Sequence, residues 1–85
     1  MIYKCRKIEY KEIEYFDMVI WNGNNIKEVG KFVATAPLTY LNNTLTIIQP
    51  GVDQKQIHIG DYILKDKDRF FIYKQDEFRK IFEIV

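Results

Sequence analysis

The sequence predicts an α+β domain, in which a small antiparallel β-sheet built from hairpins packs with one main helix and a short C-terminal helix. Two observations predict this class. β-Branched and aromatic residues recur in short runs separated by turn residues, as in hairpins. Residues 26–33 instead place apolar side chains at helical spacing. With 85 residues the chain can bury one core, so we expect a single domain over residues 1–85.

The N-terminal segment, residues 3–21, alternates apolar and polar side chains with the period of a strand. Its apolar residues change phase near residues 11–14. Either two strands joined by a turn or one long strand with a bulge would produce this change. A helix over residues 7–16 is the alternative, because Glu and Lys favour helix.

The first helix is predicted directly after the Asn-rich stretch. Asn25 precedes Glu28 by three residues, the spacing of a capping box. The apolar residues then fall on one helical face: Ile26, Val29, Phe32 and Val33. Gly30 weakens a helix, which suggests close packing at that position. We expect the helix to end near Ala34, because Pro37 disfavours helix in the residue before it.

Residues 38–48 form the clearest hairpin in the sequence. Two β-rich runs flank Asn42 and Asn43, and Asn tolerates the positive φ that a two-residue turn requires. A short strand with both of its Ile residues on one face is expected over residues 56–59. Gly60-Asp61 then turns the chain.

The C-terminal third predicts a hairpin followed by a helix. Residues 62–65 and 70–74 are expected to pair across the charged turn 66–68. Asp76 has the side chain of an N-cap for a short helix. That helix would carry three apolar residues: Phe78, Ile81 and Phe82. Residues 83–85 are expected to add a final strand.

Two blocks of the chain carry a resemblance. The first block comprises Trp21, Gly23, Asn24 and Asn25. The second comprises Gly60, Asp61, Tyr62, Ile63 and Lys65, followed by Phe78 and Glu83. Together they resemble a family of small phage and prophage proteins that have no assigned activity. Ile59 and Asp66 depart from that family's usual Pro and Gly. The resemblance implies a phage or prophage origin and supplies no catalytic residue.

Reactive side chains are too few to predict an enzyme. Cys5 and His58 are the only residues of their types, so they cannot build a structural zinc site. Their spacing does not indicate a nucleophile and its base. We therefore expect no catalytic residue, metal or cofactor. A single thiol is compatible with a reducing bacterial cytoplasm, and no apolar run reaches the roughly 20 residues that span a membrane.

Aromatic residues make up 15% of the chain, which favours a protein-binding surface. The predicted interface residues are Trp21, Tyr40, Tyr62 and Tyr73. We expect the partner to be a host protein, such as a defence, replication or transcription factor, that the chain inhibits by steric occlusion. Nucleic-acid or nucleotide binding through the basic N-terminal strand is the alternative, with candidate residues Lys4, Arg6, Lys7 and Lys11. Open strand edges are also compatible with a homodimer.

Overall fold

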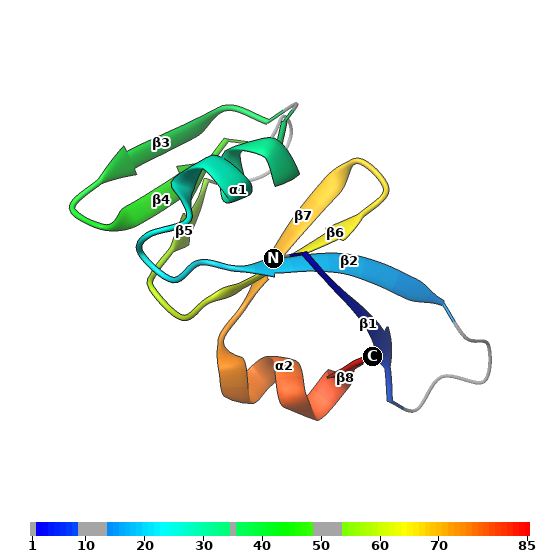
Figure 1. Ribbon diagram of the computed structural model, residues 1–85. Coiled ribbons are helices and arrows are strands. Elements are labelled where there is room, and N and C mark those ends of the chain that lie inside the picture. The colour runs from blue at the N-terminus through cyan, green and yellow to red at the C-terminus, as the bar shows by residue number, and fades with distance from the viewer. Residues whose placement is uncertain (1, 9–13, 35, 49–53) are drawn as a thin grey trace.

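The computed structural model describes residues 2–8, 14–34, 36–48 and 54–85 (Figure 1). These segments contain strands and two helices, which confirms the α+β class. In chain order the elements are β1 (Tyr3–Lys7), β2 (Tyr15–Ile20), α1 (Ile26–Phe32), β3 (Leu38–Leu41), β4 (Thr44–Ile47), β5 (Lys55–Ile57), β6 (Tyr62–Asp66), β7 (Arg69–Tyr73), α2 (Gln75–Ile81) and β8 (Phe82–Ile84).

The strands form two antiparallel sheets, where the sequence predicts one. The larger sheet has the order β7-β6-β2-β1-β8, and the smaller has the order β3-β4-β5. The segment between β2 and β6 builds the smaller sheet together with α1. Helix α2 connects β7 and β8, which are the two edge strands of the larger sheet.

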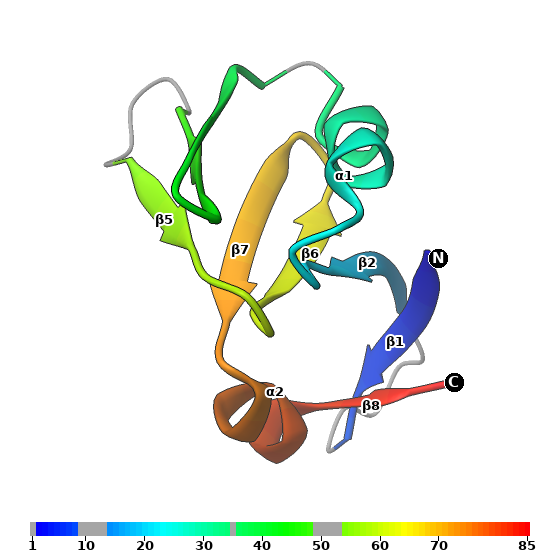
Figure 2. The ribbon, with the colours of Figure 1, turned by 60° about the vertical axis from the view of Figure 1, so that its left-hand side comes forward.

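Two cores lie on opposite faces of the larger sheet, because successive side chains of a strand point to opposite faces. Figures 1 and 2 show α1 and the smaller sheet on one side and α2 on the other. The first core contains Val19, Trp21, Val29, Phe32, Val33, Leu45, Ile47, Ile57, Ile63 and Phe70. The second core contains Cys5, Phe16, Met18, Tyr62, Leu64, Phe78 and Phe82.

The N-terminal segment forms two strands rather than one bulged strand. β1 and β2 are antiparallel neighbours, with Tyr3 opposite Met18. The helical alternative is wrong for Lys7, Tyr15 and Phe16, which all lie in strands. The change of phase predicted near residues 11–14 falls mostly on residues 9–13, which lie outside the described structure. Pairing with β6 and β8 on either side favours strand over the local helix preference of this segment.

The start of α1 differs from the predicted capping box. The Asn25 side chain makes no capping hydrogen bond to the helix. Its Oδ1 instead accepts a hydrogen bond from the Asn22 backbone N–H at 3.0 Å. Its Nδ2 donates to the Ile20 carbonyl and to Glu28 Oε1. The Asn25 side chain therefore links the loop after β2 to the start of the helix. It does not cap the backbone N–H groups of the first helical turn, although the sequence predicted that it would.

The buried face of α1 is narrower than predicted. Val29, Phe32 and Val33 are buried, but Ile26 is 38% exposed at the first position of the helix. The helix ends at Phe32. Gly30 does not mark close packing, since no atom from other parts of the described chain lies within 4 Å of the place where a Cβ would be added.

Both predicted hairpin turns are confirmed. Asn42 and Asn43 adopt φ values of 51° and 64°, and Lys67 adopts a φ of 56° in the turn between β6 and β7. The 38–48 hairpin aligns Leu41 with Thr44 across the two-residue turn. The strand predicted over residues 56–59 is shifted, because β5 ends at Ile57.

The C-terminal helix begins earlier than predicted. Lys74, not Asp76, is the N-cap residue, and Asp76 lies within the first turn of α2. Phe78 is buried as expected, whereas Ile81 is 42% exposed. Phe82 already belongs to β8, so the last strand starts one residue before the predicted boundary.

Candidate protein-docking pocket

A pocket opens where α2, β8 and the end of β1 meet, with a volume of about 310 Å³. Figure 2 shows α2 leading directly into β8, which runs alongside β1. The residues that line the pocket come from three parts of the chain: Ile8, Tyr62, Phe78, Arg79, Phe82, Glu83 and Ile84. We refer to this site as the α2–β8 pocket.

Stacked aromatic rings form the floor of the α2–β8 pocket. The rings of Phe78 and Phe82 stack with centroids 5.2 Å apart and planes at 20°. Tyr62 packs against Phe78 at 4.7 Å, and Tyr73 packs against Phe82 at 5.4 Å. Phe78 and Phe82 are almost fully buried. Because aromatic pairs of this kind stabilise by about 0.5–1.5 kcal/mol each beyond burial, the floor is fixed before any partner arrives.

Exposed aliphatic side chains surround this floor. Ile8 is 48% exposed and Ile84 is 45% exposed, and both line the pocket. Nearby, the Ile8 backbone N–H donates to the Ile81 carbonyl at 2.9 Å. That hydrogen bond holds the end of β1 against the end of α2. The result is an apolar rim that stays accessible to solvent.

One charged side chain lies at the same rim. Arg79 projects from the last turn of α2 and lines the pocket. Glu83 also contributes to the lining, but its side chain accepts from Arg6 Nε across the β1–β8 pair, on the sheet face opposite to that of Phe82. The rim therefore offers a positive charge beside an apolar centre.

The four predicted interface residues lie on two different sides of the larger sheet. Trp21 is fully buried in the first core, and Tyr40 packs edge-on against its ring at 5.9 Å. Tyr62 and Tyr73 belong to the aromatic cluster beneath the α2–β8 pocket. The residues do not form one patch, because Trp21, which directly follows β2, lies on the opposite side of the larger sheet from Tyr62.

Trp21 is a core residue, although the sequence predicted it at an interface. Its side chain is 0% exposed, and its indole Nε1–H donates to the Asn43 carbonyl at 2.9 Å. Tyr62 is also buried, at 7% exposure, and reaches the surface only as part of the pocket lining. Tyr40 is 51% exposed and Tyr73 is half-buried.

The basic residues of the nucleic-acid alternative do not form one positive face. Lys4 pairs with Asp17 and Arg6 pairs with Glu83. Strand alternation directs Lys7 to the sheet face opposite that of Lys4 and Arg6, and Lys11 lies outside the described residues. The ion pairs lower the positive potential that a phosphate backbone would require.

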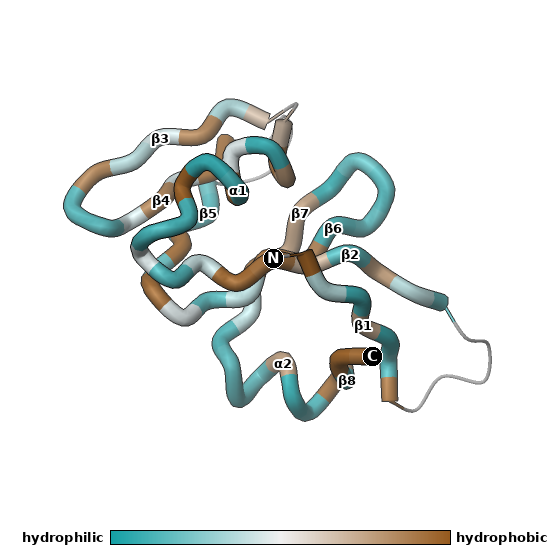
Figure 3. The backbone as a smooth tube through the Cα atoms, viewed as in Figure 1, coloured by the Kyte–Doolittle hydropathy of each residue, from teal (hydrophilic) through white to brown (hydrophobic). Residues whose placement is uncertain are grey.

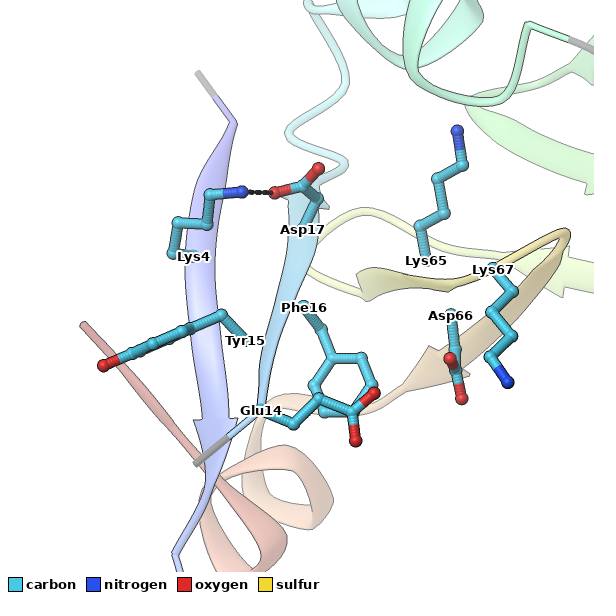
Figure 4. Close-up of a pocket in the computed structure, with 8 residues that line it drawn as sticks. All are labelled: Lys4, Glu14, Tyr15, Phe16, Asp17, Lys65, Asp66 and Lys67. Atoms are coloured by element: carbon cyan, nitrogen blue, oxygen red, sulfur yellow. Dashed lines mark hydrogen bonds and ion pairs between the residues drawn. The ribbon is translucent and has the colours of Figure 1, made fainter. Parts of the chain in front are cut away.

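A shallower polar pocket, of about 270 Å³, lies over β1, β2 and the β6–β7 turn (Figure 4). Its lining includes three lysines and three carboxylates, together with Tyr15 and Phe16. Figure 4 shows Lys65 and Lys67 pointing in different directions, and the Lys4–Asp17 ion pair at one wall. Balanced charges of this kind give little attraction for an anion.

Cys5 and His58, the only residues of their types, lie in different environments. The Cys5 thiol is fully buried, and burial together with the Asp17 charge raises its pKa to about 11. The thiol is therefore protonated at neutral pH and is a poor nucleophile. His58 is half-exposed, with its Nδ1 3.8 Å from Asp61 Oδ2. Within the described segments, no three His, Cys, Asp or Glu residues are grouped so that they could hold a metal ion.

Asp61 is a structural residue whose role the sequence analysis missed. It is 3% exposed and accepts hydrogen bonds from the Lys74 ammonium at 2.9 and 3.0 Å. It also accepts from the His58 backbone N–H at 2.8 Å. The signal was present as an acidic residue in a Gly-Asp turn directly before an apolar strand. Its partner, 13 residues later, could not be read from that turn.

No protein-family model, curated protein or solved structure matches this chain. Function is therefore inferred from the surfaces of the chain itself. Neither α1 nor α2 has the length and apolar character needed to cross a membrane, and the same holds throughout the part of the chain that the structure describes. Figure 3 shows hydrophilic and hydrophobic residues interleaved along both helices.

Proposed function

We propose that this chain is a non-enzymatic protein of phage origin that binds a host protein and inhibits it by covering its surface. The α2–β8 pocket would receive an apolar side chain of that protein. The observation that supports this most is the combination, in one place, of a fixed aromatic floor, exposed Ile residues and the charged side chain of Arg79.

The pocket has the composition of a protein interface. Protein interfaces combine a desolvated apolar or aromatic centre with a polar rim, and aromatic and Arg residues are enriched among their energetically important positions. Phe78 and Phe82 supply the centre, while Arg79 supplies a charged group at the rim. Because the stacked rings are already ordered, a partner would lose little side-chain entropy on this side of the interface.

The volume of the pocket is sufficient to receive a bulky apolar side chain of a partner. Small-molecule sites usually measure about 300–1,000 Å³, and this pocket lies at the lower end at about 310 Å³. A large aliphatic or aromatic side chain fits within that space. The flanking Ile8 and Ile84 would then lose solvent contact against the surrounding surface of the partner.

The host identity of the partner is supported by the sequence resemblance to phage and prophage proteins. In that setting the partner would be a bacterial defence, replication or transcription factor in the host cytoplasm. A non-enzymatic domain that binds such a factor would inhibit it by steric exclusion. Nucleic-acid binding through Lys4, Arg6, Lys7 and Lys11 is the alternative to test against.

The proposal is tested by capture from a lysate of a candidate bacterial host, using the tagged chain and an Ile8→Asp variant. Ile8 lies in the turn after β1, where Asp is well tolerated. The matched control is Ile26→Asp, since Ile26 is 38% exposed in the first turn of α1 and an acidic residue suits a helix N-terminus.

We expect a host protein that wild type and Ile26→Asp retain equally and that Ile8→Asp loses by at least about tenfold, or roughly 1.4 kcal/mol of binding free energy. Equal capture by all three forms would refute the pocket as the docking site. Retention that disappears after nuclease treatment or at high salt would instead support the nucleic-acid alternative.

A further inference from the structure

We infer that the chain self-associates into a two-fold dimer by antiparallel pairing of β3 with β3 of a second copy. Strand β3 is an edge strand of the smaller sheet. Figure 1 shows it at the far side of the molecule from α2. The dimer surface is therefore separate from the α2–β8 pocket, and this inference does not depend on the proposed host partner.

Strand β3 is the least protected edge in the described part of the chain. The two sheets have four edge strands, which are β3, β5, β7 and β8. Natural proteins guard such edges with charged residues that resist pairing. β5 contains Lys55, β7 contains Arg69 and β8 contains Glu83, whereas β3 reads Leu-Thr-Tyr-Leu.

The backbone of β3 presents its outward hydrogen-bonding groups at two defined residues. The Ile48 N–H donates to the Pro37 carbonyl at 3.0 Å, which places Pro37 in a hydrogen-bonded pair with β4. Along an antiparallel strand such pairs alternate with non-hydrogen-bonded pairs. Leu38 and Tyr40 therefore direct their N–H and C=O groups away from β4, toward the open side of the sheet.

A two-fold axis through Thr39 satisfies these groups. Leu38 would lie opposite Tyr40 of the second copy, and Tyr40 opposite Leu38 of the second copy. Each of the two pairs would exchange two hydrogen bonds, because antiparallel narrow pairs are reciprocal. Thr39 would face Thr39 of the second copy across the axis.

The side chains in this register are complementary to their own copies. Leu38 and Tyr40 lie on the sheet face that carries Leu45 and Ile47, so an aliphatic residue would meet an aromatic one. Thr–Thr and aliphatic–aromatic cross-strand pairs are favourable, and like charges directly opposite one another are not. Here no charge opposes a charge, because β3 carries none.

The exposed apolar side chains of β3 are also consistent with a contact between two copies of the chain. Tyr40 is 51% exposed and Leu41 is 73% exposed, the latter on the outer face of the smaller sheet. Pairing of four-residue strands buries less than the roughly 800 Å² per partner of a standard interface. We therefore expect a weak dimer that forms as concentration rises.

Sedimentation equilibrium up to about 1 mM chain, the range in which weak complexes are populated, tests this assignment. The variant is Thr39→Lys, which places two ammonium groups opposite each other across the axis. The control is Thr46→Lys, which adds the same charge to the cross-strand neighbour of Thr39 on the central strand β4.

We expect wild type and Thr46→Lys to show the same monomer–dimer equilibrium, and Thr39→Lys to raise the dissociation constant at least tenfold. An equimolar mixture of Thr39→Lys and Thr39→Glu should recover the dimer, which a misfolded variant could not do. A wild type that is monomeric at every concentration would overturn the inference. So would equal effects of the two lysine variants, or a mixture that stays monomeric.

Discussion

The carboxylate of Asp61 holds the ammonium of Lys74 through hydrogen bonds of 2.9 and 3.0 Å. Asp61 lies in the turn before β6, and Lys74 is the N-cap residue of α2. The same carboxylate accepts the His58 backbone N–H. This contact joins the turn after β5 to the start of α2. It therefore sets the position of the helix that supplies Phe78 to the pocket floor.

Asp61→Ala should lower the free energy of unfolding by about 1–3 kcal/mol, because the charged hydrogen bonds to Lys74 and His58 are lost. The lower half of this range is favoured, since the Lys74 side chain is 54% exposed and can be solvated. Asp61→Asn is the control, since it still accepts from the His58 N–H and should cost less. Urea denaturation measures both. An Asp61→Ala variant as stable as wild type would contradict this role.

Two glycines should respond to alanine with opposite signs. Gly60 adopts a φ of +94°, a conformation that L-residues rarely adopt, whereas Gly30 lies inside α1. Among the described residues, no atom beyond the chain neighbours and the backbone of the same helix lies within 4 Å of either added Cβ, so backbone conformation decides the outcome. We expect Gly60→Ala to destabilise by about 1–2 kcal/mol and Gly30→Ala to stabilise by about 0.5–1 kcal/mol. Thermal unfolding that shifts both in one direction would be inconsistent with the described backbone.

Trp21 should behave as a core residue. We expect its fluorescence emission to be blue-shifted and resistant to iodide quenching, because the indole is fully buried. Trp21→Phe should destabilise by about 1–3 kcal/mol through lost volume and the lost hydrogen bond to Asn43. Tyr40→Phe, which removes only an exposed hydroxyl contact with Asn43, is the matched control and should cost far less. Emission typical of exposed indole would refute the assignment.

The local turns and strand runs were predictable because each depends on neighbouring residues. Asn42 and Asn43 have positive φ values, which their residue type favours. Lys67 also has a positive φ in a hairpin turn, although its residue type does not favour it. The division into two sheets was not predictable. It depends on the pairing of β2 with β6, which lies more than 40 residues later in the chain. Pairing between strands so far apart in sequence leaves no local signal.

Fewer features of the pocket than of the fold could be predicted from the sequence. Tyr62 and Tyr73 were selected for their residue type, and they do lie in the aromatic cluster at this site. Ile8 and Ile84 were missed, because their exposure follows from the meeting of the two chain ends at the β1–β8 pair. Asn25 shows the same limit at a helix start, where its amide bonds back to Ile20.

Cys5 should make stability fall at alkaline pH. Its pKa is about 11 in the folded chain against 9.0 for an ordinary thiol. Between these values the unfolded chain loses the proton and the folded chain keeps it, so unfolding is favoured as pH rises. The slope contributed by this thiol should approach about 1.4 kcal/mol per pH unit.

The contribution of Cys5 is isolated by comparing wild type with Cys5→Ala. Tyr73, whose pKa is raised chiefly by burial and next by the charge of Cys5, adds a slope of the same sign to both proteins, and this slope is smaller in Cys5→Ala. The difference in unfolding free energy should therefore be flat below about pH 9 and narrow or reverse between about pH 9 and 11, in the window set by the thiol. A constant difference across the whole range would contradict the raised thiol pKa.

Hydrogen exchange on the complex with the captured host protein tests the central claim most directly. If the α2–β8 pocket is the docking site, amide protection should increase at Ile8 and over Arg79–Ile84. Strand β3 should exchange at the rate it shows without that protein at the same chain concentration. Protection confined to other surfaces, with Ile8 and Arg79–Ile84 unchanged, would contradict the account.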